Sequence, residues 1–415
     1  MKMEEISIRL KGRTLEGVPA LPASKSIANR LLVINALSGN KIKINNLSNA
    51  NDTVVLKEIL NSKLEIRDPE QQTIVDCRDA GTVMRFLIGY FSIMPGKWLL
   101  KGTERMHQRP VKILVNKLKE LGADIKYLEK DGFPPLLISG KSLKGGKLTI
   151  DASISSQYIS ALMMIGPYLE GGLELELTGK ISSLPYIIMT AGIMEQCGVK
   201  VEINGNNIFI EEDEYSETEF TVESDWSGAS YWYAFAALAE NAEITLSNLY
   251  QQSLQGDSIL AEWMTAFGVE TRFTAEGVEL TKTGNAINYF EQNFTNCPDL
   301  APTFIVLCAA LSIPAKFYGL ESLAIKESDR TAAIAAELGE LNIDFINREA
   351  YWELIPNPDF WKINVPPAFK TYNDHRLAMA FAMFGSVFSE VTIKNPSVVK
   401  KSYPWFWKDI ELTIK

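Results

Sequence analysis

The chain has 415 residues, of which 46% are hydrophobic and 22% are charged. This length and this apolar content exclude intrinsic disorder and fibrous architecture, and they predict two domains. The chain carries 51 Asp and Glu against 41 Lys and Arg, a net charge of -10, so its surface as a whole does not attract nucleic acid or an anionic membrane. An anionic ligand must therefore meet a local group of cations.

The N-terminus predicts a first strand, because charged and apolar side chains alternate in MKMEEISIRLKG. This stretch lacks the apolar core of a signal peptide and the Arg and Ser bias of a transit peptide. The longest apolar run, residues 300–314, contains prolines and is shorter than the roughly 18 residues of a membrane span. It predicts a buried helix, and we expect a soluble, cytoplasmic protein.

Cysteine and histidine are too few and too scattered for the common metal sites and disulfide frameworks. The chain contains Cys77, Cys197, Cys297, Cys308, His107 and His375. No CxxC pair is present, which argues against a zinc ribbon and a dense disulfide framework and fits a reducing compartment. Two histidines cannot form a multi-histidine metal site. We expect no metal and no cofactor.

One event recurs six times along the chain: a small or polar residue opens an amphipathic helical run. The openings lie 57, 74, 70, 74 and 75 residues apart, at Ser24, Gly81, Ser155, Asp225, Asp299 and Asp374. In most units a second helix ends at a small residue and a pair of alternating strands follows; these ends are Gly122, Gly198, Gly268 and Asn342. Each unit therefore predicts the order βαβαββ, and the six units predict an α/β fold made by duplication.

Six units of roughly 70 residues divide naturally into two globules of three. The opening strand lacks its own helices, so the chain is expected to cross between globules near residues 19–22 and again near 222–224. We predict a discontinuous domain of residues 1–22 plus 224–415 and an inserted domain of residues 23–223. The active site is expected in the cleft between them.

The first helix opening, SKSIANR, combines a cap with mobile charges. Ser24 is the expected N-cap. Ser26 and Arg30 lie four residues apart on one face, next to Lys25 and to the free N–H groups of the first turn, which is an arrangement suited to phosphate. The alternative is a capped helix with a solvated cationic face. A separate apolar stripe is expected at Ile27, Leu31 and Ile34.

The second and third openings repeat this logic. Gly81, between Ala80 and Thr82, lets a ligand approach the backbone closely, and a tight turn without a ligand is the alternative. The third opening supplies hydroxyl and amide groups from Ser155, Ser156 and Gln157. The helix after Gly81 should direct inward the side chains of Val83, Leu87 and Tyr90.

Further charges gather in loops and at later helix starts. KGTERMHQRPVK is expected to be a loop that carries Arg105, His107 and Arg109 and ends at Pro110, an expected first helical position. In IKESDR, Ser328 or Asp329 should cap a helix that Arg330 enters, whereas Lys326 and Glu327 should lie in the preceding loop. The last two charged motifs are NDHR, residues 373–376, and VVKKSYP with Lys400 and Lys401.

An acidic chain that repeatedly places cations at equivalent helix starts predicts a cationic cleft for small phosphorylated ligands. The cations concerned are Lys25, Arg30, Arg109, Lys326, Arg330, Arg376 and Lys401. Two carboxylates in the same motifs, Asp299 and Glu327, are available for proton transfer. Neither a P-loop nor a GxGxxG motif is present.

These motifs resemble those of the 5-enolpyruvylshikimate-3-phosphate synthase family, in the same order, from about residue 21 to residue 404. The matching segments are LPASKSIANR, DAGTVMR, RMHQRP, SSQ, SLPY, SDWSGASY, LQGD, PDLA, IKESDR, YNDHR and KKSYP. The resemblance implies the two-domain enolpyruvyl transferase fold, with six βαβαββ repeats arranged three per domain around pseudo-threefold axes. It also implies transfer of an enolpyruvyl group from phosphoenolpyruvate to shikimate 3-phosphate, without metal or cofactor, in the pathway to chorismate and the aromatic amino acids.

The resemblance further implies the binding residues. Those for shikimate 3-phosphate are Lys25, Ser26, Arg30, Ser155, Ser156, Gln157, Ser183, Tyr186, Asp299, Ser322 and Lys326. Those for phosphoenolpyruvate are Lys25, Asp79, Gly81, Arg109, Gln157, Arg330, Arg376 and Lys401. Asp299 would accept the proton of the 5-hydroxyl, and either Glu327 or Lys25 would protonate the methylene carbon. We expect a monomer without nucleic-acid or membrane partners.

Three positions depart from the family's pattern. Asp79 and Ser322 stand where the family usually has Asn, and Phe86 stands where it has Pro. We expect these changes to alter the affinity for phosphoenolpyruvate and for its mimic glyphosate. Two other functions remain open, namely the sister transferase that acts on UDP-N-acetylglucosamine and a noncatalytic phospholigand-binding protein. Phosphate release from the two substrates would separate them.

Overall fold

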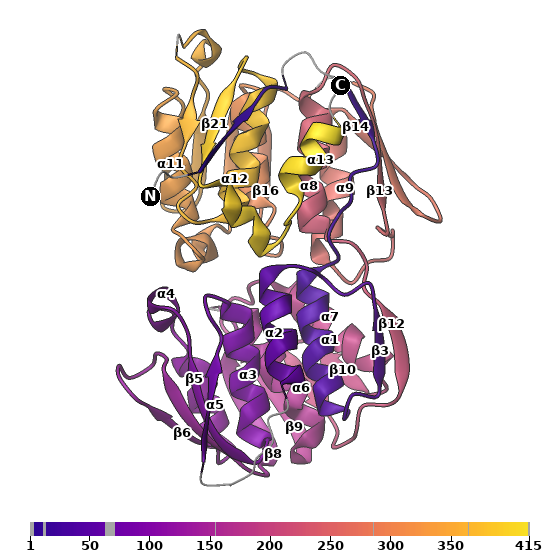
Figure 1. Ribbon diagram of the computed structural model, residues 1–415, viewed down its shortest axis with the longest axis vertical. Coiled ribbons are helices and arrows are strands. Elements are labelled where there is room, and N and C mark those ends of the chain that lie inside the picture. The colour runs from indigo at the N-terminus through magenta and orange to yellow at the C-terminus, as the bar shows by residue number, and fades with distance from the viewer. Residues whose placement is uncertain are drawn as a thin grey trace. The chain divides into compact units, whose positions relative to one another are not determined.

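The computed structural model describes residues 4–10, 14–62, 71–153, 155–284, 286–363 and 365–413. The chain divides into two compact units (Figure 1): unit 1 comprises Met1–Pro22 and Glu223–Lys415, and unit 2 comprises Ala23–Val222. The expected first strand is present as β1 (Glu5–Ile8). Residues 1–3 and 11–12 of the stretch that predicted it lie outside the described residues.

Four sheets share one strand order, in which the first two strands are parallel and the last two form an antiparallel hairpin. In unit 2 these are β4 (Gln72–Asp76), β5 (Gly96–Lys101), β7 (Leu136–Gly140), β6 (Asp124–Tyr127), and β8 (Lys144–Asp151), β9 (Glu170–Thr178), β11 (Asn207–Ile210), β10 (Val201–Asn204). In unit 1 they are β2 (Leu15–Gly17), β13 (Ala242–Ser247), β15 (Gly277–Lys282), β14 (Val269–Phe273), and β16 (Phe290–Asn293), β17 (Ala315–Tyr318), β19 (Trp352–Ile355), β18 (Asp344–Asn347). This order is the one that a βαβαββ repeat produces.

The other two sheets join strands that are distant in sequence. In unit 2, β3 (Ile42–Asn45) pairs in parallel with β12 (Thr218–Thr221). In unit 1, β1 pairs antiparallel with β21 (Val391–Lys394), which also pairs in parallel with β20 (Ala368–Phe369). Within the described residues, each unit therefore contains three sheets, in agreement with the predicted three repeats per unit.

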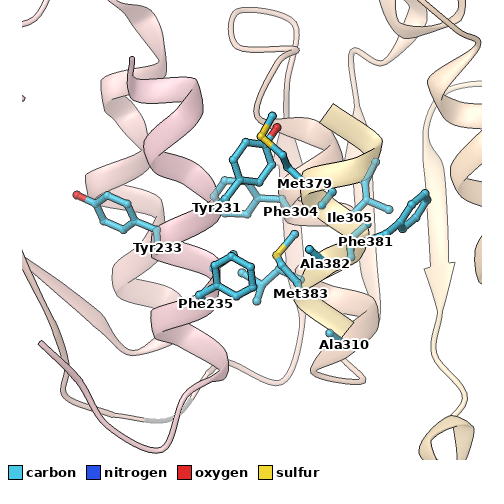
Figure 2. Packing of buried hydrophobic residues seen from close by; sticks show 14 of the residues in the cluster. Tyr231, Tyr233, Phe235, Phe304, Ile305, Ala310, Met379, Phe381, Ala382 and Met383 are labelled. Atoms are coloured by element: carbon cyan, nitrogen blue, oxygen red, sulfur yellow. The ribbon is translucent and has the colours of Figure 1, made fainter. Parts of the chain in front are cut away.

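Six helices begin at the predicted openings. They are α1 (Lys25–Leu37), α3 (Gly81–Ile93) and α6 (Ser156–Ile165) in unit 2, and α8 (Trp226–Leu238), α10 (Ala301–Ala310) and α12 (His375–Phe381) in unit 1. In unit 2 the three helices pack against one another, and in unit 1 α10 packs against both α8 and α12. Figure 2 shows side chains of α8, such as Tyr231 and Phe235, directed toward those of α10 and α12. The predicted inward residues of α1 and α3 are buried: Ile27, Leu31, Ile34, Val83, Leu87 and Tyr90.

The second helices end as predicted, at a small residue in the left-handed conformation that turns the chain into a strand. The φ angles are 94° at Gly122, 94° at Gly198, 73° at Gly268 and 55° at Asn342. The preceding helices are α5 (Lys112–Glu120), α7 (Leu184–Gln196), α9 (Leu260–Trp263) with the 3₁₀ helix η3 (Met264–Phe267), and α11 (Arg330–Gly339). The remaining helices are α2 (Asn51–Asn61), η1 (Gly166–Tyr168), η2 (Gly256–Ile259), η4 (Glu321–Ile325), η5 (Phe360–Lys362), η6 (Ala382–Ser386), η7 (Pro396–Lys401) and α13 (Phe406–Thr413).

The prediction for KGTERMHQRPVK was wrong in two details. Pro110 is not the first helical residue, since α5 begins two positions later at Lys112. The expected loop also contains a short helix, α4 (Glu104–His107), because Thr103 caps it by accepting a hydrogen bond from the N–H of Met106, whose side chain is buried. The apolar run 300–314 forms the buried helix α10, as predicted. None of the helices in the described ranges combines the length and apolar character needed to cross a membrane.

Candidate active site

A buried arginine organises the charged groups of unit 1. Asp329 caps α11, which places Arg330 at the first helical position. The Arg330 guanidinium is 1% exposed and lies 2.8 Å from Asp374, 2.9 Å from Glu327 and 3.2 Å from Asp299. Burial alone would lower the pKa of Arg330, but the three carboxylates together raise it above its ordinary value. This permanent cation therefore fixes three carboxylates that come from separate repeats or motifs.

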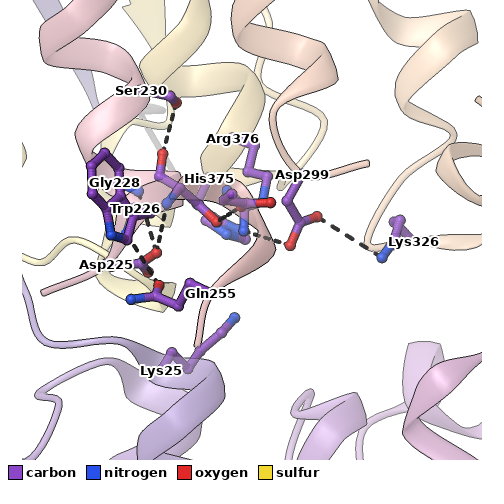
Figure 3. A network of polar contacts seen from close by, with 12 residues as sticks. Lys25, Asp225, Trp226, Gly228, Ser230, Gln255, Asp299, Lys326, His375 and Arg376 are labelled. Atoms are coloured by element: carbon purple, nitrogen blue, oxygen red, sulfur yellow. Dashed lines mark hydrogen bonds and ion pairs between the residues drawn. The ribbon is translucent and has the colours of Figure 1, made fainter. Parts of the chain in front are cut away.

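Asp299 is surrounded by cations (Figure 3). Arg376, in the first turn of α12, donates to its Oδ2 at 2.7 Å, and Lys326 Nζ lies 3.9 Å from its Oδ1. Asp374 caps α12 and accepts from the backbone N–H of Arg376 at 2.9 Å, which orients that arginine. Desolvation lowers the pKa of Lys326. Unit 1 thus brings together the five site residues that the sequence predicted from PDLA, IKESDR and NDHR, namely Asp299, Lys326, Glu327, Arg330 and Arg376.

Glu327 lies between two cations. Its Oε2 accepts from Arg330 at 2.9 Å, and its Oε1 is 3.8 Å from Lys401 Nζ. Lys401 is the last residue of η7 and is nearly buried, whereas the neighbouring Lys400 is exposed. The two lysines of KKSYP therefore differ, and Lys401 is the one that reaches the charged group.

Asp257 is a buried carboxyl group to which the sequence reasoning gave no role. It is 4% exposed and accepts a hydrogen bond from the hydroxyl of Ser227. Burial, followed by the nearby charge of Asp299, raises the pKa of Asp257 to about 7. The LQGD segment contains this residue, but sequence alone cannot show that its carboxyl group is dry.

The raised pKa of Asp257 predicts a specific pH dependence of stability. The folded chain holds the Asp257 proton up to about pH 7, whereas an unfolded Asp loses it near pH 3.9, so this group destabilises the fold as the pH rises from about 4 to 7. Asp257→Asn should remove a fall of roughly 3–4 kcal/mol in the free energy of unfolding over that range.

Urea unfolding of both proteins between pH 4 and pH 8 measures the difference. The exposed Asp344→Asn in β18 is the matched control and should leave the pH dependence unchanged. If the free energy of unfolding changed equally with pH in the wild type and in Asp257→Asn, the pKa of Asp257 would not be raised in the folded protein.

In unit 2, Lys25 is paired with a carboxylate that the sequence did not predict. Lys25 is the first residue of α1, after the cap Ser24. Its Nζ lies 3.5 Å from Oδ2 of Asp52, whose side chain is 3% exposed and lies in the first turn of α2. The N-terminal end of a helix favours a carboxylate there. The position of the Lys25 ammonium group is therefore fixed by a carboxylate from a different helix, α2.

Arg30 lies in a polar part of the core of unit 2. It is 2% exposed, and its guanidinium donates to Thr190 at 2.7 Å, to Ser160 at 3.0 Å and to the carbonyl of Ser26 at 2.9 Å. Its Cζ lies 5.4 Å from the centre of the Phe86 ring. Burial lowers the pKa of Arg30 to about 10. The alternative of a solvated cationic face is wrong for this residue.

Gln157 is fixed at both ends of its amide group. Its Nε2 donates to Thr82 at 3.0 Å, and its Oε1 accepts from Arg85 at 2.8 Å. The neighbouring Tyr158 hydroxyl donates to the carbonyl of Pro110 at 2.6 Å. These contacts link the starts of α3 and α6 to the segment that carries Arg109. Ser155 caps α6, and Ser156 is its first residue.

Arg109 lies directly against the backbone of Gly81. A Cβ atom on Gly81 would be 2.6 Å from Cζ of Arg109 and closer still to Nη1. The Nε of Arg109 is buried and has no hydrogen-bond partner among the described residues. The other two residues predicted together with Arg109 in this loop differ from it: Arg105 is exposed, and His107 accepts from the N–H of Gly102. The guanidinium of Arg109 therefore lies against the start of α3, and its Nε has no partner among the described residues.

The remaining predicted residues occupy helix starts or turns. Ser183 is the left-handed residue before α7, and the carbonyl of Tyr186 accepts from Arg30 at 3.4 Å. Ser322 is half-buried in η4, and Asp79 is half-buried in the turn before α3. Phe86 lies inside α3, which continues unbroken through it.

Cysteine and metal chemistry find no support among the described residues. No group of three or more His, Cys, Asp or Glu side chains there could hold a metal ion. The four cysteines are free and buried, and burial raises the pKa of each thiol above its ordinary value. Each unit instead offers cations at helix starts, and unit 1 adds carboxylates suited to moving protons.

Comparisons with known proteins agree with one another. The family model of EPSP synthase (3-phosphoshikimate 1-carboxyvinyltransferase) matches residues 10–410. A 3-phosphoshikimate 1-carboxyvinyltransferase of Bacteroides fragilis is 45% identical over 393 residues, which cover 94% of this chain and 93% of the relative. One of Methanospirillum hungatei is 33% identical over 411 residues, 94% of each chain. The solved structure of EPSP synthase from Acinetobacter baumannii is similar in fold, with a TM-score of 0.79, 21% identity and 99% coverage of both chains.

Proposed function

The chain belongs to the EPSP synthase (3-phosphoshikimate 1-carboxyvinyltransferase) family, and we propose that residues of both of its units bind the two substrates of that reaction. The chain transfers the enolpyruvyl group of phosphoenolpyruvate to the 5-hydroxyl of shikimate 3-phosphate and releases phosphate. The observation that carries the proposal for this chain's residues is the contact of Arg109 with Gly81. The guanidinium lies directly against the backbone of this glycine, and its buried Nε has no hydrogen-bond partner among the described residues.

We assign to each substrate the residues that are proposed to bind it. Phosphoenolpyruvate binds to Lys25, Asp79, Gly81, Arg109, Gln157, Arg330, Arg376 and Lys401. Shikimate 3-phosphate binds to Lys25, Ser26, Arg30, Ser155, Ser156, Gln157, Ser183, Tyr186, Asp299, Ser322 and Lys326. The starts of α1, α3 and α6 support anion binding through their free N–H groups.

The reaction needs one base and one acid. Asp299 accepts the proton of the 5-hydroxyl while that oxygen forms a bond to C2 of phosphoenolpyruvate, and Glu327 or Lys25 gives a proton to the methylene carbon. Elimination then reverses these roles: Glu327 or Lys25 takes a proton from the methyl group, the C2–O bond to phosphate breaks as the double bond re-forms, and Asp299 returns its proton to the departing phosphate. The cations around Asp299 hold this carboxylate in a fixed orientation.

Gly81→Ala tests the proposed phosphoenolpyruvate site. The added methyl group would displace the guanidinium of Arg109, so we expect the KM for phosphoenolpyruvate to rise about tenfold or more, which corresponds to roughly 1.4 kcal/mol. The affinity for shikimate 3-phosphate should remain within about twofold, because its proposed ligands are other residues. Gly81 does not have a positive φ, so alanine fits its backbone conformation.

Phosphate release under varied concentrations of each substrate gives both constants. Gly339→Ala is the control, since an added Cβ meets nothing within 4 Å there. An unchanged KM for phosphoenolpyruvate in Gly81→Ala would contradict the assignment. Release of phosphate by the wild type with shikimate 3-phosphate, and none with UDP-N-acetylglucosamine, excludes both the sister transferase and a noncatalytic binding protein.

The same proposal includes a monomeric, cytoplasmic enzyme without nucleic-acid or membrane partners. A net charge of -10 supports the lack of anionic polymer partners. Four free, buried cysteines support a reducing compartment.

A further inference from the structure

A buried carboxylate in unit 1 joins the last helix to the strap, by which we mean Pro19–Pro22 before the first chain crossover. Asp409 lies in the first turn of α13 and is 5% exposed. One of its oxygens, Oδ2, accepts both the N–H of Ala20 at 3.1 Å and the hydroxyl of Tyr403 at 2.7 Å. A single atom thus holds two segments that are nearly four hundred residues apart in sequence.

Tyr403 is fixed at both ends. Its side chain is fully buried, and its hydroxyl also accepts from the indole N–H of Trp232 in α8 at 3.1 Å. Its backbone N–H donates to the carbonyl of Val399 in η7 at 2.8 Å. Lys401 lies between Val399 and Tyr403 in the chain, so the turn that carries its ammonium group is held on both sides.

The strap is held at two further points. The indole N–H of Trp405 donates to the carbonyl of Ala20, and the carbonyl of Pro22 accepts from the N–H of Asp225 at 2.9 Å. Asp225 caps α8, the helix that carries Trp232. The hydrogen bonds therefore form a closed network: Asp409 binds the strap, the strap binds the cap of α8, α8 binds Tyr403 through Trp232, and Tyr403 binds Asp409. Both α8 and α13 belong to unit 1 (Figure 1).

We propose that Asp409 and Tyr403 are positioning residues that hold Lys401 beside Glu327 and tie its turn to the strap. The inference rests on the proposed assignment of Lys401 to phosphoenolpyruvate. Burial raises the pKa of Asp409 and of Tyr403, so keeping these polar groups dry costs free energy that apolar side chains of similar size would not cost. What the polar pair adds is fixed geometry, because its hydrogen bonds are directional.

Substitutions at the pair test this role through the KM for phosphoenolpyruvate. Asp409→Ala removes the shared acceptor and should raise this KM about tenfold, with kcat within about twofold. Tyr403→Phe keeps the ring and leaves the hydrogen bond from Ala20 to Asp409 in place, so it should raise the KM for phosphoenolpyruvate only about threefold. Asp409→Asn keeps an acceptor oxygen and should stay close to the wild type. A purely structural role would instead lower the amount of active enzyme, and with it the apparent kcat, at an unchanged KM.

Two further variants separate the possible failures. Glu411→Ala, an exposed change in the same helix, should leave both constants unchanged. If Lys401→Met does not raise the KM for phosphoenolpyruvate, the assignment of Lys401 is wrong. If Lys401→Met raises it while Asp409→Ala and Tyr403→Phe do not, the positioning role is wrong. Should Asp409→Ala fail to fold, Tyr403→Phe decides alone.

Discussion

Asp299→Ala should lower kcat by about 10²–10⁴-fold, the effect of removing one positioned proton-transfer group, while both substrates still bind. Asp299 lies 2.7 Å from Arg376, 3.2 Å from Arg330 and 3.9 Å from Lys326. Removing its charge leaves these cations in place and makes the site more positive. Anion affinity should therefore persist or increase, and the loss should fall on turnover.

Phosphate release measures kcat, and calorimetric titration measures the binding of each substrate. Asp299→Asn is the isosteric control, since it keeps the volume but cannot accept the proton; it should lose as much turnover as Asp299→Ala. Turnover close to that of the wild type in either variant would exclude Asp299 as the base. Loss of substrate binding along with turnover would show that its role is mainly structural.

Glu327→Gln should also lower kcat by about 10²–10⁴-fold if Glu327 is the acid that protonates the methylene carbon. The amide keeps the shape of the carboxyl group, and its oxygen can still accept from Arg330, which now lies 2.9 Å from Oε2. Substrate binding should therefore survive. Single-turnover measurements with saturating substrates isolate the chemical step from product release.

Lys25→Met is the companion variant, because Lys25 is the other candidate acid. Its ammonium lies 3.5 Å from Asp52 and is also a proposed ligand of both substrates, so this variant should raise both KM values. A Glu327→Gln enzyme that retains turnover, beside a Lys25→Met enzyme that loses it even at saturating substrates, would assign the proton to Lys25.

Most of the fold could be predicted because its local signals are strong and repeated. The caps at Ser24, Ser155 and Asp225 and the left-handed glycines each fix an element end without help from distant residues. The enolpyruvyl transferase fold is confirmed by the likeness to the Acinetobacter baumannii structure. Pro110 was placed wrongly because Val111 has a non-helical backbone conformation and donates its N–H to the distant carbonyl of Gly132, so α5 begins only at Lys112.

The cations of the candidate site could be predicted from the sequence, but most of the side chains that bind these cations could not. Lys326, Arg330 and Arg376 stand in recognisable motifs. The acceptors that hold Lys25 and Arg30, namely Asp52 and Thr190, lie in other helices and resemble ordinary polar residues in sequence. Their roles depend on burial and on packing between helices, which motif spacing does not specify.

The way each unit completes its sheets sets an order during synthesis. Unit 2 has all its strands once β12, which ends at Thr221, has left the ribosome and can pair with β3. In unit 1, β1 must wait for β21, since Glu5 pairs with Lys394. In the nascent chain β1 therefore stays without its partner until β21 has been synthesised, while the unit encoded between them can already fold.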